Sequence, residues 1–380
     1  MKNINDDVKK ILILFVIVKI AILFVGVLGY NFVDFSENYY EESYVYMDYK
    51  TAPLISVWAH WDGQWYMKIA ENGYKIMGNE LDKFGVAFFP LYPIVMSILL
   101  LVIKNPHIAG LIVSYLASFF ALLFLYRLLR EEFGSKISER TIFYYLIFPS
   151  AMFLSAVYSE SLFLLLTVLV FYFARKKLWL YAGLVGVLAS LTKLIGVIVF
   201  IPLLIEYILV KKEEIGEKWW TGIDFKIVYC FLPGLGTLMY FTYLWKLTGS
   251  FFAYFLAEQL WGREPFSFHT FIEIFQNLAL HGYKNSIIDL TFALVFLGML
   301  FFMYKRLRLS YVVYAALLIL IPISSGSLLC FSRLVLMSFP HFIMFAMLGE
   351  DKNVHYGLSI VFSVLLAIFT VMFVNHYWVG

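Results

Sequence analysis

The stretch 56–74 gathers side chains that could do chemistry within an otherwise apolar chain: Ser-Val-Trp-Ala-His-Trp-Asp-Gly-Gln-Trp-Tyr-Met-Lys-Ile-Ala-Glu-Asn-Gly-Tyr. On a helical wheel its one aspartate, Asp62, falls on the same arc as Trp61 and Trp65. A carboxylate on the apolar arc of an interfacial helix is costly unless something pairs with it. Two compatible interpretations stay open: Asp62 caps a helix that starts at Gly63, or it faces a substrate on the floor of an active site at a membrane surface.

Isolated carboxylates beside aromatic rings suit sugar chemistry. An acid can act as general base on an acceptor hydroxyl, and Lys or Arg can neutralise a leaving phosphate. Charged groups at the outer edges of predicted spans fit these roles, although each alone is better explained by helix capping or by a side chain that reaches toward the interface. Their convergence on one predicted side indicates an active site at that face. They are Asp62, Glu160, Lys193, Arg263 and Arg333.

Familiar catalytic motifs are missing from the sequence. It has no glycine-rich phosphate loop, His-Glu-x-x-His motif or serine-nucleophile elbow. Its two cysteines cannot make a zinc site, and no ligand cluster requires a metal, so we expect no cofactor, although a divalent metal is compatible. A polyprenyl-phosphate sugar is the donor that needs no cytosolic nucleotide. One base without a second nucleophilic carboxylate nearby predicts single displacement with inversion, by analogy with glycoside hydrolases.

The composition predicts an all-α polytopic membrane protein. Of the 380 residues 62% are hydrophobic and only 14% are charged, and the mean hydropathy is +0.82, which is more apolar than a soluble domain needs. The net charge of +3 is too small to indicate nucleic-acid binding. The first apolar run, 11–30, follows Lys9 and Lys10 and has no Ala-x-Ala exit, so we expect a retained span rather than a cleaved signal.

Eleven spans are expected, and charge decides the status of one further apolar run, 86–103. If this run does not cross, 18 of the 29 basic residues lie on the inner side, as the positive-inside rule requires. The run is therefore predicted to be interfacial or re-entrant, with the N-terminus inside and the C-terminus outside. The expected spans lie near 11–30, 108–126, 141–157, 161–174, 178–192, 194–210, 226–247, 286–304, 311–329, 335–348 and 354–374.

Three blocks of sequence carry a resemblance to a known family. They are Trp-Asp-Gly at 61–63, continuing to Ile-Ala-Glu-Asn-Gly-Tyr at 69–74, Ala-Phe-Phe-Pro-Leu-Tyr-Pro at 87–93 and Tyr-Ser-Glu-Ser-Leu-Phe at 158–163. In this order they resemble the PIG-V type of mannosyltransferases, which are GT-C membrane glycosyltransferases related to the second mannosyltransferase of GPI-anchor synthesis. The chain departs from that pattern at Lys193-Leu-Ile-Gly, where the family shows Arg and Asn-Gly, and at Arg333-Leu, where it often shows Arg-Tyr.

The resemblance implies a GT-C fold and an inverting transfer from dolichyl- or polyprenyl-phosphate-mannose. It implies a catalytic module at 1–247, with juxtamembrane helices in a first outer loop at 31–107, and a variable C-terminal module at 248–380. Asp62 would be the general base, and Glu160 would support the site or bind the acceptor. The predicted substrate-binding residues are His60, Trp61, Trp65, Tyr66, Tyr158, Lys193, Arg263 and Arg333, with Lys193 and Arg333 as phosphate contacts.

The acceptor could be a glycolipid, a lipid-linked oligosaccharide or a protein. The enzyme would lie in the cell membrane of a prokaryote, with its site on the outer face, or in the endoplasmic reticulum of a eukaryote. A transporter or flippase of lipid-linked sugars is one alternative, but transporters concentrate polar groups at mid-membrane and often repeat. Here the predicted span interiors are nearly free of charge, with Lys19 and Glu206 as exceptions that could lie near span ends, and the two halves do not repeat. A non-catalytic membrane subunit and an enzyme for another lipid-linked sugar are the others.

Overall fold

The computed structural model describes residues 4–34, 52–75, 84–260, 262–263 and 284–379, and every regular element within them is a helix. The chain divides into two compact units. Unit 1 comprises Met1–Gly73, Tyr92–Leu165 and Phe342–Gly380, and unit 2 comprises Tyr74–Leu91 and Leu166–His341. This division by packing does not follow the predicted boundary at 247, and the assignment of catalysis to 1–247 stays a prediction.

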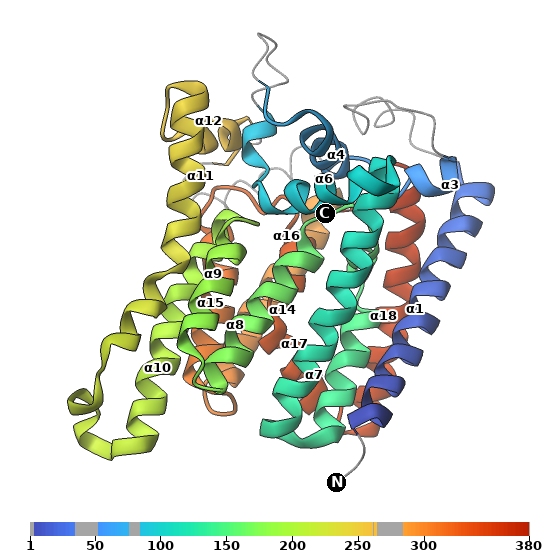
Figure 1. Cartoon of the computed structure of the whole chain (residues 1–380). Helices are drawn as coiled ribbons and strands as arrows, with labels where there is room; N and C mark the ends of the chain where they lie inside the picture. Colours follow the sequence, from blue (N-terminus) through green and yellow to red (C-terminus); the bar gives the residue numbers. More distant parts are fainter. Residues whose placement is uncertain (1–3, 35–51, 76–83, 261, 264–283, 380) are drawn as a thin grey trace. The chain divides into compact units, whose positions relative to one another are not determined.

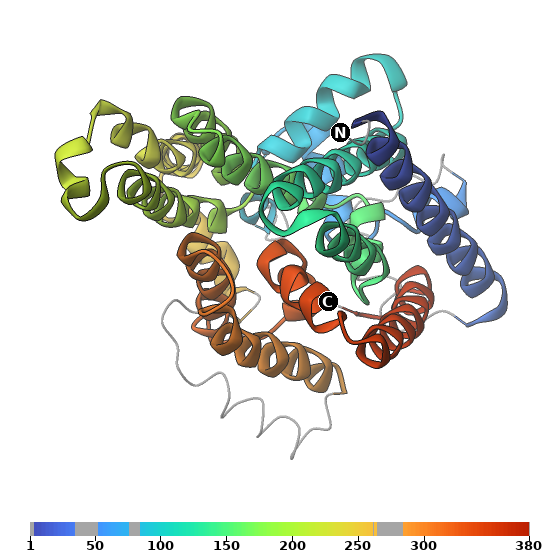
Figure 2. The same ribbon diagram turned by 90° about the horizontal axis from the view of Figure 1, so that it is seen from below.

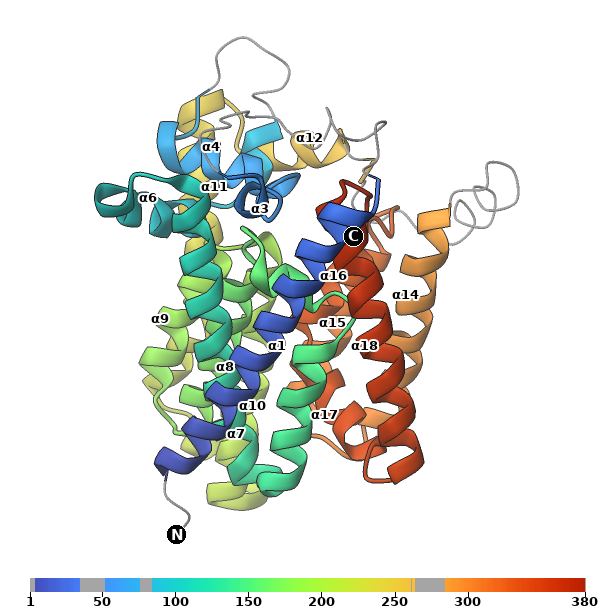
Figure 3. The same ribbon diagram turned by 90° about the vertical axis from the view of Figure 1, so that its right-hand side faces the viewer.

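Three long helices form the frame of unit 1: α1 (Ile4–Phe32), α7 (Pro106–Ile147) and α18 (Lys352–Val374). Helix α1 packs on both of the others, which Figures 2 and 3 show from below and from the side. Helix α7 is broken at Gly134 (φ 77°), where it reverses direction. A left-handed φ suits glycine. The predicted inner loop at 127–140 is therefore helical on both sides of one glycine.

Short helices gather at the end of α1 that lies away from the N-terminus (Figure 3). They are α3 (Pro53–Ser56), α4 (Asp62–Asn72) and α6 (Leu91–Ile103). Figures 1 and 3 show α6 lying crosswise to α7. This is the orientation expected of a helix that does not cross, and its 13 residues are fewer than the roughly 20 that a crossing needs. The exposed side chains of α6 are apolar, which suits contact with lipid. They include Ile94, Ile98, Leu101 and Val102.

Unit 2 is built from shorter helices joined by 3-10 turns. They are α8 (Glu160–Arg175, which begins in unit 1), α9 (Trp179–Ser190), η3 (Leu194–Val199), α10 (Phe200–Ile215), η4 (Gly216–Gly222), η5 (Phe225–Phe231), α11 (Pro233–Thr248), α14 (Lys284–Met303), α15 (Leu309–Ile323), α16 (Phe331–Leu334), η6 (Val335–Met337) and α17 (Phe339–Leu348, which ends in unit 1). Helix α9 packs on α11, and α10 packs on α15. Helices α9 and α11 approach closely at Gly236, where a Cβ would overlap the Ser190 hydroxyl.

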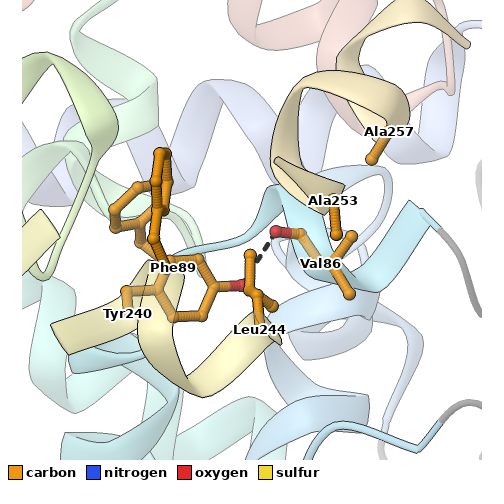
Figure 4. Close-up of a cluster of buried hydrophobic side chains, with 7 residues drawn as sticks. Val86, Phe89, Tyr240, Leu244, Ala253 and Ala257 are labelled. Atoms are coloured by element: carbon orange, nitrogen blue, oxygen red, sulfur yellow. Dashed lines mark hydrogen bonds between the residues drawn. The ribbon is translucent and has the colours of Figure 1, made fainter. Parts of the chain in front are cut away.

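An aromatic and aliphatic cluster fixes the segment that leads into α6. Figure 4 shows it: η1 (Gly85–Ala87) packs against α11 and α12 (Ala253–Gln259). The Tyr240 hydroxyl donates to the carbonyls of Val86 (2.8 Å) and Phe88 (3.2 Å). The second sequence block, 87–93, is thus held by its backbone carbonyls as well as by its rings. The cluster comprises Val86, Phe89, Tyr240, Phe241, Leu244, Ala253 and Ala257.

Four helices in the described ranges are long and apolar enough to cross a membrane, and up to six if each bent pair is one span. Four shorter apolar helices accompany them: α6, α9, α14 and α15. The chain is a multi-pass integral membrane protein. The count of eleven spans stays a prediction, because several predicted spans are built from helices shorter than the roughly 20 residues that a perpendicular crossing needs.

The buried acid of α10, Glu206, has no exposed surface and lies in an ion cluster of unit 2. It accepts hydrogen bonds from Arg175 Nη1 (3.0 Å), Arg308 Nε (3.2 Å) and Ser310 Oγ (2.6 Å). These partners come from the end of α8 and the start of α15, so one carboxylate joins three helices. Removing one partner from such a cluster leaves buried charge uncompensated.

We expect Glu206→Gln to lower the free energy of unfolding by about 3–5 kcal/mol, because Arg175 loses its buried counter-charge and Arg308 loses the buried one of its two. Glu213 bonds the same Arg308 (2.7 Å) from an exposed position. Glu213→Gln should therefore cost no more than about 1 kcal/mol. Chemical unfolding of both variants in one detergent measures the difference. Equal losses would show that Glu206 contributes no more than a surface ion pair.

The topology predicts opposite labelling of two introduced cysteines. A cysteine near 104–107 should react with an impermeant maleimide added outside intact cells, because α6 stays at the outer surface. A cysteine near 133–136, at the reversal of α7, should react only after the membrane is opened. The native cysteines Cys230 and Cys330 are both buried, and the parent protein controls for them. Reversed labelling would mean that α6 crosses.

Candidate active site

The predicted base stands at the first position of helix α4. The helix begins at Asp62 itself, and Trp61 occupies the cap position without a side-chain capping bond. The proposed cap of a helix starting at Gly63 is therefore displaced by one residue, and Asp62 belongs to the first turn. A carboxylate there is stabilised by the helix dipole by about 0.3–1 kcal/mol. Asp62 and Trp61 are partly exposed, unlike the residues on either side of them.

Burial around Asp62 is more complete than the helical wheel predicts. His60, Trp65, Tyr66 and Tyr158 are all at least nine-tenths buried, so in this structure they support the turn from within. On the opposite arc of the wheel Gln64 and Met67 are buried too. The side-chain amide of Gln64 donates a hydrogen bond to the Ala59 carbonyl (2.8 Å). The predicted contacts of these residues with a sugar stay predictions, while Asp62 and Trp61 are the accessible part of the motif.

The first and third sequence blocks meet within unit 1. The amide of Val157 donates to the Trp58 carbonyl (2.8 Å), and the Tyr158 hydroxyl donates to the His60 carbonyl (3.2 Å). A glycine after Asp62 suits this close approach, because a Cβ at position 63 would lie 3.2 Å from the Val157 carbonyl oxygen, a tight contact. Close backbone packing on 157–158 thus accounts for the glycine of the Trp-Asp-Gly sequence.

Glu160 opens helix α8 behind this contact and is 1% exposed. Next to it the Ser159 hydroxyl shares a hydrogen bond with the Tyr66 hydroxyl (2.7 Å). The Tyr92 hydroxyl donates to the Gly110 carbonyl (3.0 Å). Burial raises the pKa of Tyr92, its bond to Ser114 opposes this, and the nearby charge of Glu160 raises it further. Asp62 is accessible and Glu160 is not, so in this structure only Asp62 could contact a bound substrate.

The predicted cations lie in unit 2, and two of them border one segment. Arg263 donates to the Leu329 carbonyl (3.0 Å) and to Glu258 (2.9 Å). Arg333 lies in α16, four residues beyond Leu329, and is 7% exposed. Lys193 precedes η3 in an extended conformation and is partly exposed. The structure therefore brings Asp62 and Glu160 together in unit 1 and Arg263 and Arg333 together in unit 2.

Two features of these sites were missed by the sequence analysis. Asp289 in α14 is buried and accepts a hydrogen bond from the Ser332 amide (2.9 Å), so a carboxylate holds the turn that carries Arg333. The signal was an acid near the start of an apolar run. The second feature is the C-terminal segment 375–379, which packs on the Asp62 turn. Its signal was a polar and aromatic tail after the last span.

His60 contacts both the end of α18 and that tail. Its Nε2 lies 2.7 Å from the Phe373 carbonyl oxygen, so Nε2 carries the proton. Burial lowers the pKa of His60 well below its usual range, and His376 adds to the effect. Burial also lowers the pKa of His376, to about 4. Both rings are therefore neutral in the folded protein near pH 7, and protonation would place charge in a buried contact.

We expect the stability of the protein to fall as the pH drops from about 6.5 toward 4. In this window the unfolded chain binds a proton at His376 and the folded chain does not, so acid favours unfolding. The melting temperature of the wild type should therefore fall more steeply between pH 7 and pH 5 than that of His376→Gln. Carboxylate effects are common to both proteins and cancel. Parallel curves would contradict a neutral, buried His376.

Comparison with known proteins supports the fold. Residues 89–236 match the model of the dolichyl-phosphate-mannose-protein mannosyltransferase family. The crystal structure of ArnT from Cupriavidus metallidurans bound to undecaprenyl phosphate is similar with a TM-score of 0.51 and 11% identity, covering 97% of this chain and 76% of that one. An Archaeoglobus fulgidus oligosaccharyltransferase, with zinc and sulfate, is similar with a TM-score of 0.45 and 11% identity, covering 96% and 53%. No curated protein sequence matches the chain significantly.

The expected GT-C fold is confirmed by the likeness to the ArnT structure. The resemblance to GT-C enzymes is likewise confirmed, whereas the narrower PIG-V assignment stays a prediction. The roles of the individual site residues, and the expected independence of a metal, also stay predictions.

Proposed function

We propose that this integral membrane protein of the GT-C fold is a glycosyltransferase that moves a hexosyl residue, mannose first among the candidates, from a polyprenyl-phosphate donor to a hydroxyl acceptor. One observation carries the proposal: a partly exposed carboxylate, Asp62, stands on a buried platform made by the segments 58–66 and 157–160. The match of 89–236 to a family named for dolichyl-phosphate-mannose and the fold shared with ArnT support a lipid-linked donor.

In the proposed reaction Asp62 is the general base. It takes the proton of the acceptor hydroxyl as that oxygen bonds to the anomeric carbon, and the bond from that carbon to the phosphate oxygen breaks. The polyprenyl phosphate leaves with the electron pair, so no external oxidant or nucleotide is consumed. Because one base acts and no enzyme–sugar bond forms, the anomeric configuration inverts.

The second part of the proposal concerns the cations that neutralise the polyprenyl phosphate as it leaves the sugar. Arg263 and Arg333 are assigned to the departing phosphate because guanidinium groups form charge-assisted, bidentate bonds to it. Both are held in place, Arg263 by Glu258 and the Leu329 carbonyl, and the Arg333 turn by Asp289. Lys193, partly exposed, is the third candidate cation. The buried Glu160 is assigned to support of the site rather than to proton transfer.

The rival transporter hypothesis depends on charged groups inside the membrane. The strongest such group, Glu206, is fully engaged by Arg175, Arg308 and Ser310. Lys19 in α1 donates to the Leu154 carbonyl (3.0 Å) and the Ser155 hydroxyl (2.7 Å). Both groups therefore serve packing within their own units, which favours the enzyme over a carrier.

We expect Asp62→Asn to lower the rate of sugar transfer by about 10²–10⁴-fold, because the amide cannot accept the acceptor's proton. Donor binding and expression should be unchanged. The measurement is transfer of radiolabelled mannose from polyprenyl-phosphate-mannose in membranes that contain the protein. Glu71→Gln is the matched control, since Glu71 is an exposed acid in the last turn of the same helix. Wild-type turnover by Asp62→Asn would sink the assignment of the base.

A further inference from the structure

The C-terminal segment after α18 returns to the proposed site. Helix α18 ends at Val374, and Asn375 and His376 are buried immediately beyond it. Figure 3 places the C-terminus at the same end of α1 as the short helix α4. Within unit 1 the residues beyond α18 therefore lie beside a turn more than 300 residues earlier in the sequence.

The two side chains directly before Asp62 are held by the end of α18 and by the segment beyond it. The His60 ring meets Phe373 edge to face (centroids 4.4 Å apart) and His376 in the same manner (4.6 Å). The Trp61 ring meets Trp378 edge to face, with centroids 4.8 Å apart and planes at 88°. The residues directly before the predicted base thus contact the tail, while their backbone is held by 157–158.

The turn needs such support because its backbone is strained. Trp61 has φ 55° and ψ −122°, a conformation that side chains other than glycine rarely adopt. A residue held in this way costs about 1–3 kcal/mol and persists only where its surroundings fix it. The contact with Trp378 supplies that constraint on the side chain of Trp61, next to the carboxylate.

We infer that His376 and Trp378, beyond the end of α18, position Asp62 for proton transfer, acting through His60 and Trp61. Trp378 and His376 are positioning residues in this inference and do not touch the reacting atoms. The inference rests on the proposed function, since it assumes that Asp62 is the base. It adds a part of the chain that the family-model match at 89–236 does not include.

A displaced base loses rate rather than affinity. A misplacement of about 1 Å can cost about 10²-fold in rate. We therefore expect Trp378→Ala to lower kcat about 10- to 100-fold and to leave the KM for the donor within about twofold. The indole N–H of Trp378 has no hydrogen-bond partner among the described residues, so its ring contact is what it contributes. Trp378→Phe should accordingly restore most of the rate.

The matched control is Tyr377→Ala on the same tail. Tyr377 is 36% exposed and lies between the two residues that make the contacts, so its removal should leave kcat unchanged. The coupling of Trp61 and Trp378 gives a further readout. If the tail acts through Trp61, adding Trp378→Ala to Trp61→Ala should change kcat little, whereas independent effects would multiply. Multiplied effects, or equal rates for Trp378→Ala and Tyr377→Ala, would overturn the inference.

A second measurement separates this inference from the proposed function. Hydrogen exchange of the amides at 58–64 should be faster in Trp378→Ala than in Tyr377→Ala, at equal melting temperature, whether or not the protein transfers mannose. Faster exchange without transfer by the wild type would reject the proposed function and leave the tail as the support of the turn. Unchanged exchange, with active wild type, would reject the positioning role alone.

Discussion

The pairing of the turn 58–62 with the segment 157–158 is the constraint on which the candidate site depends. Helix α4 has 11 residues, too few to be stable in isolation. Its position is fixed by the bond between Val157 and Trp58 and by the close approach at Gly63. Because both partners are backbone groups, the pairing holds the carboxylate of Asp62 at a defined place without using its side chain.

In an apolar chain each buried charged group needs an opposite charge or hydrogen-bond partners. In unit 2 Glu206 is satisfied by two guanidinium groups and a hydroxyl, and it joins three helices. Asp289 meets a backbone amide and thereby orders the turn of Arg333. Asp62 stands apart from these acids because it is partly exposed in the first turn of a helix. The contrast in exposure, rather than the number of acids, marks it as the group that can meet a substrate.

Much of the fold could be predicted from local pattern. The apolar runs at 11–30 and 354–374 became α1 and α18, since hydrophobicity over 20 residues depends on no distant partner. The runs at 108–126 and 141–157 were less well described: one helix continues through the basic segment between them and turns at Gly134. The sequence could not show this, because it does not distinguish a glycine inside a continuous helix from a glycine at which the chain reverses direction.

The sequence by itself determined the membrane class, the choice of Asp62 and Glu160, and the order of the blocks that carry them, because composition, charge and motif spacing are local properties. Only the tertiary structure decided that Asp62 is accessible and Glu160 buried, and that His60, Trp65, Tyr66 and Tyr158 support the turn from within. It also decided that the tail beyond α18 contacts His60 and Trp61. These are contacts between distant segments, and burial belongs to the packed whole rather than to any stretch of residues.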